Sequence, residues 1–375
     1  KRVYLDSASI APLRPGARSA MAQGLQLPAA DPSRLHSEAL EVRGHLEHAR
    51  ETVASFIGSR SSEVVFTSSA TEAIALAVRG ALGKGGPGTV VIGTAVEHSA
   101  VRDSAGEDFR AAPVDGHGIV DLAAFERLLD SEPLIALAAC QLGNHEMGAV
   151  QPVREIADMC SAHGVLLLVD AAQAAPWLPL QFLSSGADLL ALSGPKLGGP
   201  PGTGALVVKR GKRLPPLLVG GAQERGRRAG LENTPAVLGM AAACAEMEQN
   251  QTREIERAVE LTNQLRDGLN EIDGVRIYGP SIPSQRLPHL VCCGIDGVEP
   301  QAVLLELDRA GIAAHSGSAC ASEDLEPSPV LEAMGIDAHN SLRFSVNALV
   351  SDDDIARTVI VLAQAIRRLR QLSGS

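Results

Sequence analysis

Val165-Leu-Leu-Leu-Val-Asp-Ala-Ala-Gln173 is the stretch of sequence that decides the fold. An uninterrupted apolar run leads into Asp170, which is typical of a strand buried on both faces of a sheet. Similar apolar runs precede and follow it, and amphipathic stretches separate them, as expected for parallel strands joined by helical crossovers. The expected strands of this α/β core span residues 63–67, 89–93, 134–140, 165–169, 189–193 and 204–208.

Amphipathic patterns predict the helices and a second, smaller domain. One helix is expected at 72–80, where Thr71 offers a cap, and another at 153–163. After Thr234 we expect a helix to residue 248 and, beyond a polar run, a second helix to residue 270. We place the domain boundary at that run, with a large domain of residues 12–250 and a small α+β domain of residues 1–11 and 251–375. The small domain's expected elements span 275–278, 290–295, 300–310, 341–346 and 352–369.

Composition excludes several classes of protein. The 375 residues are 45% apolar and 21% charged, which is typical of a globular chain with a large core. A net charge of −11, no basic run and 2% aromatic residues argue against nucleic-acid binding. Prolines break the longest uncharged run, so no membrane span is expected. The six cysteines form no CxxC pair or zinc pattern, which predicts no metal site and a cytoplasmic location.

Asp170 and Lys196 follow two successive strands of the predicted sheet. Seen alone, each has an ordinary explanation, as a turn-forming aspartate and as a solvated lysine in a loop rich in glycine and proline. Ligands of open α/β sheets bind beyond the carboxyl ends of the strands, so we expect both side chains to face one crevice. A lysine that binds an aldehyde and an acid that keeps a pyridine nitrogen protonated are what pyridoxal phosphate requires.

Other residues fit the same chemistry less specifically. The hydroxyl-rich turn at 67–71 precedes a helix whose N-terminus is suited to a phosphate, although such turns are also common caps. His98 follows another strand, and a lone histidine is more often structural than catalytic. Cys320 lies among small residues, where a thiol can be exposed and reactive, although most such cysteines are inert. Arg343 lies in an apolar strand and needs a partner, for which a substrate carboxylate is suited.

In this order the motifs resemble those of the cysteine desulfurases in the class V aminotransferase family, which are fold-type I pyridoxal-phosphate enzymes. The resemblance covers nearly the whole chain. It implies an α/β fold with a mostly parallel central sheet, helices on both faces of the sheet and a smaller C-terminal α+β domain. The matching segments are residues 4–9, 35–37, 66–72, 97–101, 169–173, 193–196, 220–233, 317–320 and 342–345.

The resemblance implies pyridoxal 5'-phosphate as cofactor. Lys196 would form the covalent link, Asp170 would contact the pyridine nitrogen and Gln173 the ring hydroxyl. His98 would stack on the ring. The phosphate would be held by Ala70, Thr71 and Ser193.

The resemblance also implies a reaction and its partners. L-Cysteine would be converted to L-alanine, with Lys196 and His98 moving protons. Cys320 would take the sulfur as a persulfide and pass it to an acceptor protein, and Arg343 and His145 would bind the substrate. The family is dimeric, so a homodimer is expected.

Departures from the family's pattern leave alternatives open. Pro195 replaces a phosphate-binding histidine, Leu231 a threonine that reaches the partner's phosphate, and His145 an asparagine, and residues 346–350 also differ. The chain is then either another class V enzyme, such as an aminotransferase, racemase, β-lyase or selenocysteine lyase, or a non-catalytic scaffold on the same fold. Formation of alanine from cysteine separates the desulfurase from the other enzymes, and absence of bound cofactor would favour the scaffold.

Overall fold

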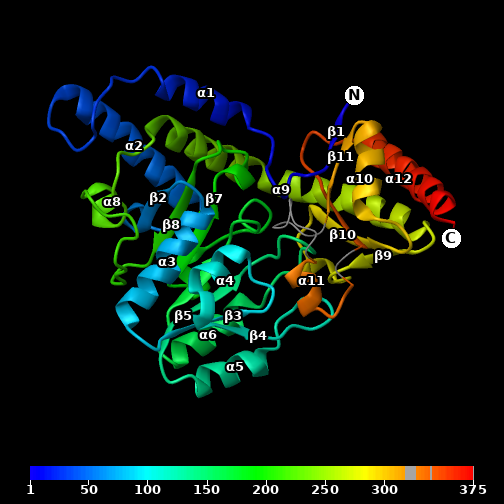
Figure 1. Ribbon diagram of the computed structural model, residues 1–375. Helices are drawn as coiled ribbons and strands as arrows, with labels where there is room; N and C mark the ends of the chain where they lie inside the picture. Colours follow the sequence, from blue (N-terminus) through cyan, green and yellow to red (C-terminus); the bar gives the residue numbers. More distant parts are fainter. Residues whose placement is uncertain (317–326, 338–339, 375) are drawn as a thin grey trace.

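A seven-stranded sheet forms the centre of the larger part of the molecule in the computed structural model, which describes residues 1–316, 327–337 and 340–374 (Figure 1). The strands are β2 (Val64–Thr67), β3 (Val90–Thr94), β4 (Phe109–Ala112), β5 (Ile135–Gln141), β6 (Leu167–Asp170), β7 (Leu189–Ser193) and β8 (Gly204–Val208). Their order is β2-β8-β7-β6-β5-β3-β4. β8 is antiparallel to both of its neighbours, and every other pair is parallel, so the expected mostly parallel sheet is confirmed.

Side chains of each strand alternate between two apolar layers. In β2, Val64 and Phe66 pack into one layer, and Val65 packs into the other. Because both faces are covered, the central strands read as continuous apolar runs. One face is covered by α2 (Ser37–Phe56), α5 (Leu122–Ser131) and α6 (Val153–Ala162), and the other by α3 (Ala70–Gly85) and α4 (Ser99–Ala105).

The C-terminal part of the chain, where strands and helices were expected, forms a second, antiparallel sheet. Its strands, in order, are β12 (His315–Ser316), β13 (Ser341–Ser345), β10 (Leu290–Ile295) and β9 (Val275–Tyr278), and its helices include α10 (Pro300–Arg309) and α12 (Asp352–Ser373). β1 (Val3–Tyr4) pairs in parallel with β11 (Ile312–Ala313). The first residues of the chain therefore lie in this part of the molecule, and the exact domain bounds stay a prediction.

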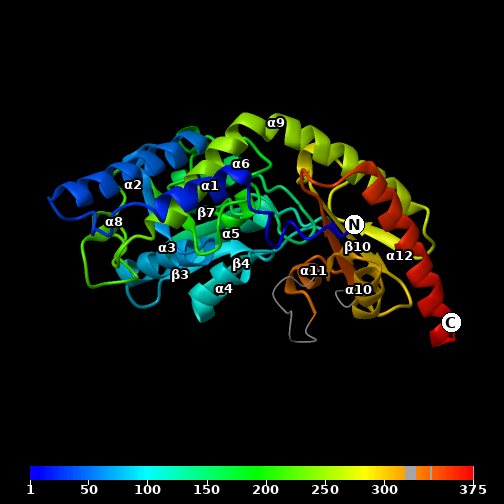
Figure 2. The same ribbon diagram turned by 90° about the horizontal axis from the view of Figure 1, so that it is seen from above.

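One long helix joins the two parts. Two helices were expected between Thr234 and residue 270, but the structure has a single α9 (Thr234–Asn270) that passes from one core to the other (Figure 2). The prediction was wrong because the polar run 248–257 holds no proline or glycine, and its Glu, Gln and Arg residues favour a helix. The polar run marks the stretch of helix between the two apolar cores.

Several elements differ from the expectation or were not predicted. Helix α3 begins at Ala70, because the Oγ of Ser69 accepts a hydrogen bond from the backbone N–H of Glu72 at 3.1 Å and caps it. Thr71 is therefore inside the helix. No helix in the described part of the chain is both long and apolar enough to cross a membrane. The unpredicted helices include α1 (Pro15–Gly24), α2, α4, α5, α7 (Phe182–Ser185), α8 (Gln223–Gly226) and α11 (Pro329–Ala333).

Candidate active site

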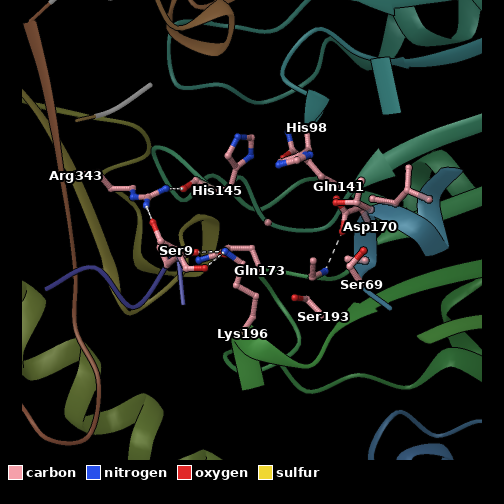
Figure 3. Close-up of a pocket in the computed structure, with 16 residues that line it drawn as sticks. Ser9, Ser69, His98, Gln141, His145, Asp170, Gln173, Ser193, Lys196 and Arg343 are labelled. Carbon is pink, nitrogen blue, oxygen red and sulfur yellow. Dashed lines mark hydrogen bonds between the residues drawn. The ribbon is translucent and has the colours of Figure 1, made fainter. Parts of the chain in front are cut away.

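A cavity of about 290 Å³ lies beyond the carboxyl ends of β6 and β7 (Figure 3). Asp170 is the last residue of β6, and Lys196 lies in the short helical turn that follows β7. Both line the cavity, as do all the other predicted site residues except Cys320, which lies outside the described residues. Ser69, from the hydroxyl-rich turn, also lines it, and lining residues that the sequence did not single out are Ala8, Ser9, Ile74, Gln141, Gly143 and Ala172.

The amine of Lys196 is held inside the site by the N-terminal segment of the chain. Its Nζ donates to the carbonyl oxygen of Ser9 at 2.7 Å and also to that of Ala8. Asp170 is buried, and its Oδ1 accepts a hydrogen bond from the backbone N–H of Ala172 at 2.9 Å. A fixed carboxylate and an amine thus line the same cavity, which is the arrangement that their strand-end positions predicted.

The N-terminal turn of α3 forms another wall of the cavity. Ser69, Ala70 and Thr71 line it, and the first N–H groups of a helix carry a partial positive charge suited to an anion. Gly204 lets this turn approach β8, because a Cβ at Gly204 would lie 2.4 Å from the carbonyl carbon of Ser69. Glu72, the next residue of the same turn, pairs with Arg228 at 2.8 Å.

Two imidazoles lie next to each other on a third side. His98 caps α4 through Nδ1, which accepts from the backbone N–H of Ala100 at 3.0 Å, so a ring proton is on Nε2. His145 meets it edge to face, with ring centroids 4.9 Å apart. His145 Nε2 also lies 3.6 Å from Glu146. The histidine that replaces the family's asparagine thus brings a second titratable ring to the cavity.

Arg343 is buried in β13 and reaches the cavity from the C-terminal sheet. Its Nη1 donates to the carbonyl oxygen of His145 at 2.9 Å, and Nη2 donates to Asp6 at 3.0 Å and Ser9 at 2.7 Å. Its Nε has no hydrogen-bond partner in the described part of the chain. A substrate carboxylate at Arg343 would therefore lie beside an ion pair that is already present.

Gln173 is supported by residues that the sequence did not indicate. Its amide nitrogen lies 2.9 Å from Nε2 of His289, which stacks on Trp177 with ring centroids 4.3 Å apart and planes inclined by 8°. Both His289 and Gln173 are buried. The signals were weak, because His289 stands 116 residues away from Gln173 and only its place just before an apolar strand marked it.

Glu97 is a buried carboxyl group next to His98. Its Oε1 accepts hydrogen bonds from Oγ1 of Thr94 at 2.7 Å and from the backbone N–H of Gln141 at 3.0 Å. Its other oxygen has no partner among the described residues. Burial raises the pKa of Glu97 to about 7, and the nearby charge of Asp170 adds to the effect.

The loop at 217–231 carries apolar side chains on the surface. Leu217, Leu218, Val219 and Leu231 are all exposed. The loop is anchored to the interior of the protein, because Glu224 is buried and accepts two hydrogen bonds from Arg50, at 2.6 and 2.8 Å. Glu224 and Arg225 both have positive φ angles, 49° and 59°, a strained backbone that these contacts hold in place.

Among the described residues, no cluster of side chains is suited to hold a metal ion.

Comparisons with known proteins point to one family. Residues 3–358 match the model of the family described as aminotransferase class-V. A cysteine desulfurase of Trichormus azollae is 38% identical to this chain, and the match spans 99% of this chain and 94% of that protein. The cysteine desulfurase IscS of Dictyoglomus turgidum is 34% identical to this chain, and the match spans 100% of this chain and 96% of that protein.

Solved structures give the same picture. The NifS-like protein of Rickettsia africae has a TM-score of 0.90 and 25% identity, over 98% of this chain and 100% of that one. A structure described as SspA in complex with cysteine has a TM-score of 0.80 and 26% identity, over 92% of this chain and 99% of that one.

Proposed function

This chain belongs to the class-V aminotransferase family and is a cysteine desulfurase, and on that premise we propose how its residues convert L-cysteine to L-alanine with pyridoxal phosphate. The observation that carries the proposal is the single cavity lined by Asp170 and Lys196, with Arg343 at its wall. An acid, an amine and a carboxylate-binding guanidinium within one cavity suit an amino-acid substrate and an aldehyde-bearing cofactor.

The donor set of the cavity fits pyridoxal phosphate. Asp170 is a buried acid suited to the pyridine nitrogen, and the start of α3 at Ala70 and Thr71, together with Ser193, suits the phosphate. Gln173 lines the cavity and one polar atom of its amide, Oε1, has no partner among the described residues, so one end of this amide is available to the ring oxygen. When bound, the cofactor supplies an aldehyde that links to the substrate's amine and a ring that withdraws electrons from its Cα.

Lys196 and His98 are the proposed proton carriers. The carbonyl groups of Ala8 and Ser9 hold Nζ of Lys196 inside the cavity, where it would take the proton from the substrate's Cα. The cap of α4 occupies Nδ1 of His98, so Nε2 is the atom that would donate a proton. His98 would also lie over the ring of the cofactor.

Arg343 and His145 are proposed to hold the substrate. Arg343 is buried and positively charged, and its Nε has no partner in the described part of the chain. The Nη1 bond from Arg343 to the carbonyl of His145 fixes the position of His145 in turn. The substrate's carboxylate would then be bound at Arg343, and the substrate's sulfur would point away from Arg343 into the cavity.

Cys320 is the proposed sulfur acceptor. It lies outside the described residues, but the residues on both sides lie beside the site: His315 is opposite Arg343 in the sheet, and Oγ of Ser328 donates to Glu146 at 2.5 Å. The Cys320 thiolate would attack the substrate's sulfur, so that an S–S bond forms and the C–S bond breaks. The bonding electrons stay with Cβ, which takes a proton to become the methyl group of alanine.

The proposed partners are a second copy of the chain and a protein that takes the sulfur. The exposed apolar residues of the 217–231 loop, three of them consecutive in the chain, support a homodimer, since apolar groups that cluster on a surface mark interfaces. The described cysteines are unpaired thiols, which supports a reducing cytosol as the location.

The test is to load the purified protein with pyridoxal phosphate, add L-cysteine, and measure alanine, sulfide and the mass of Cys320 peptides. Lys196→Ala is expected to lose the visible absorption of the bound cofactor and to form alanine about a thousandfold more slowly. Cys320→Ala is expected to keep the absorption but to gain no sulfur mass.

Lys212→Ala is the matched control, because Lys212 is a half-exposed lysine that pairs with Asp188 away from the cavity. It is expected to behave as the parent protein does. Sulfide release by Cys320→Ala at the parent's rate would contradict the persulfide route. Absence of alanine from the parent protein would contradict the desulfurase itself.

A further inference from the structure

His289 is a buried side chain that meets the site through Gln173. Its Nε2 lies 2.9 Å from the amide nitrogen of Gln173, and Gln173 lines the cavity with Asp170 and Lys196 (Figure 3). His289 itself does not line the cavity. Among the described residues, Gln173 is therefore its hydrogen-bonded link to the cavity.

The position of the His289 ring is fixed from several directions. The ring stacks on Trp177, and the turn that holds Trp177 is tied to α9, because the amide of Gln251 donates to the carbonyls of Ala175, Pro176 and Leu178. The carbonyl of His289 accepts from the backbone N–H of Val346 at 2.9 Å. A ring held on its face and at its backbone cannot follow Gln173 if that side chain moves.

His289 is held in its neutral form. Burial lowers the pKa of its ring well below the ordinary value, and the positive charges of Arg343 and Lys196 lower it further. A neutral imidazole has one N–H donor and one acceptor nitrogen. Nδ1 of His289 has no partner in the described part of the chain, so the hydrogen bond that the described residues give this ring is the one at Nε2.

The amide of Gln173 must match whichever role Nε2 takes. If Nε2 carries the proton, it donates to Oε1 of Gln173, and the NH2 group is then turned away from His289. If Nε2 is the acceptor, the NH2 group is used by His289 and Oε1 is left over, and Oε1 is the amide atom that has no partner among the described residues. The proton on His289 therefore decides which end of the amide is offered to the cavity.

We propose that His289 is a positioning residue, which holds the amide of Gln173 so that its NH2 group donates to the ring oxygen of the bound cofactor. The proposal rests on the proposed function, because it needs the cofactor in the cavity. An ionised ring oxygen accepts hydrogen bonds only, so it selects the arrangement in which Nε2 of His289 donates to Oε1. In that arrangement the amide is turned over relative to the structure, where its nitrogen faces Nε2. The donated bond stabilises the ionised oxygen relative to the protonated one.

The test compares His289→Phe with His289→Gln in the full-length protein. Phe keeps a flat ring against Trp177 but has no hydrogen bond, whereas the Gln amide reaches the place of Nε2 and both donates and accepts. In His289→Phe we expect the pH midpoint of the cofactor's visible absorption to rise by about one unit and its affinity for the apoprotein to fall about tenfold. His289→Gln is expected to stay within about twofold of the parent in affinity.

A double-mutant cycle separates positioning from general support. If His289 acts through Gln173, then His289→Phe causes no further change in the midpoint once Gln173→Ala is present. Should His289→Phe yield no folded protein, His289→Leu replaces it, since it is also apolar and lacks the hydrogen bond. An unchanged midpoint and affinity in His289→Phe, or equal losses in His289→Phe and His289→Gln, would overturn the proposal.

The same measurements keep this proposal apart from the function on which it rests. If the parent protein shows no visible absorption with pyridoxal phosphate, the proposed cofactor is wrong, and the His289 proposal is wrong with it. If the parent shows the absorption and forms alanine but the variants do not differ, only the role of His289 is wrong.

Discussion

Glu97 places a fully buried carboxyl group directly before the histidine expected to stack on the cofactor. The ordinary pKa of a glutamate is 4.5, and burial raises that of Glu97 to about 7. The folded chain therefore keeps the proton to a higher pH than the unfolded chain does. Below the unfolded pKa the carboxyl is protonated in both states, and its burial carries no ionisation penalty. As the pH rises towards and through the folded pKa, the folded chain loses stability relative to the unfolded chain.

Glu97→Gln is expected to remove this loss. The amide stays neutral, and its oxygen can accept the same bonds from Thr94 and from the backbone of Gln141. The free energy of unfolding should be nearly that of the parent at about pH 4.5 and higher than the parent's by about 3 kcal/mol at about pH 8. Urea unfolding of both proteins at the two pH values measures it. Parallel pH profiles for the two proteins would contradict this, because they would mean that Glu97 has the same pKa in the folded and the unfolded chain.

At the scale of elements, the cap of α3 serves both the helix and the cavity. Ser69 satisfies the backbone N–H of Glu72, and the same turn presents its remaining N–H groups at the wall of the cavity. Thr67 supports the turn, because its Oγ1 donates to the carbonyl of Ser69 at 2.9 Å. The helix start is thus fixed before an anion binds.

Ser69→Ala is expected to lower both stability and cofactor affinity. Loss of the cap should cost about 1 kcal/mol of unfolding free energy, and the loosened turn should weaken pyridoxal-phosphate binding by about fivefold. Asp121→Ala is the matched control, because Asp121 caps α5 in the same way, at 3.1 Å, but does not line the cavity. Equal loss of cofactor affinity in both variants would contradict a direct role for the α3 turn. Denaturant unfolding and cofactor titration are the measurements.

The central elements and the strand-end residues could be predicted from the sequence, because both depend on local signals. The apolar runs of β6, β7 and β8 lie close to where they were expected, and Asp170 and Lys196 follow from their ends. The contacts of Ser9 and His289 could not be predicted, because their partners are 187 and 116 residues away. The prediction of two helices in place of α9 was wrong, because the sequence of a polar helical stretch between two cores cannot be distinguished from that of a linker until both cores are known.

At the scale of the whole molecule, residues from distant parts of the chain complete the site. The N-terminal segment pairs with β11 and also accepts from Lys196, and Arg343 comes from the C-terminal sheet. The apolar loop at 217–231 lies on the surface of the larger part, tied to the start of α3 through Arg228 and Glu72. A second chain seated on this loop would contact the segment that supports the proposed phosphate site.

Leu231→Glu is expected to weaken the proposed homodimer at least tenfold, because a charge would be buried in the proposed interface without a partner. Leu231 is 60% exposed in the single chain, so the substitution should leave the folding of each chain unaffected. Leu305→Glu is the matched control, since Leu305 is 61% exposed on α10. Sedimentation velocity over a range of concentrations measures the change. A dimer of unchanged stability in Leu231→Glu would place the interface elsewhere.

The buried Arg50–Glu224 pair has a consequence for how two chains would meet. A surface segment that orders only on association makes binding weaker, because the lost conformational freedom opposes it. Here the backbone beneath the exposed leucines is already anchored within one chain, through Arg50 and through the backbone N–H of Phe66, which donates to Glu224 at 2.8 Å. Each subunit would therefore present a preformed docking face, and encounter between subunits would require little rearrangement of either.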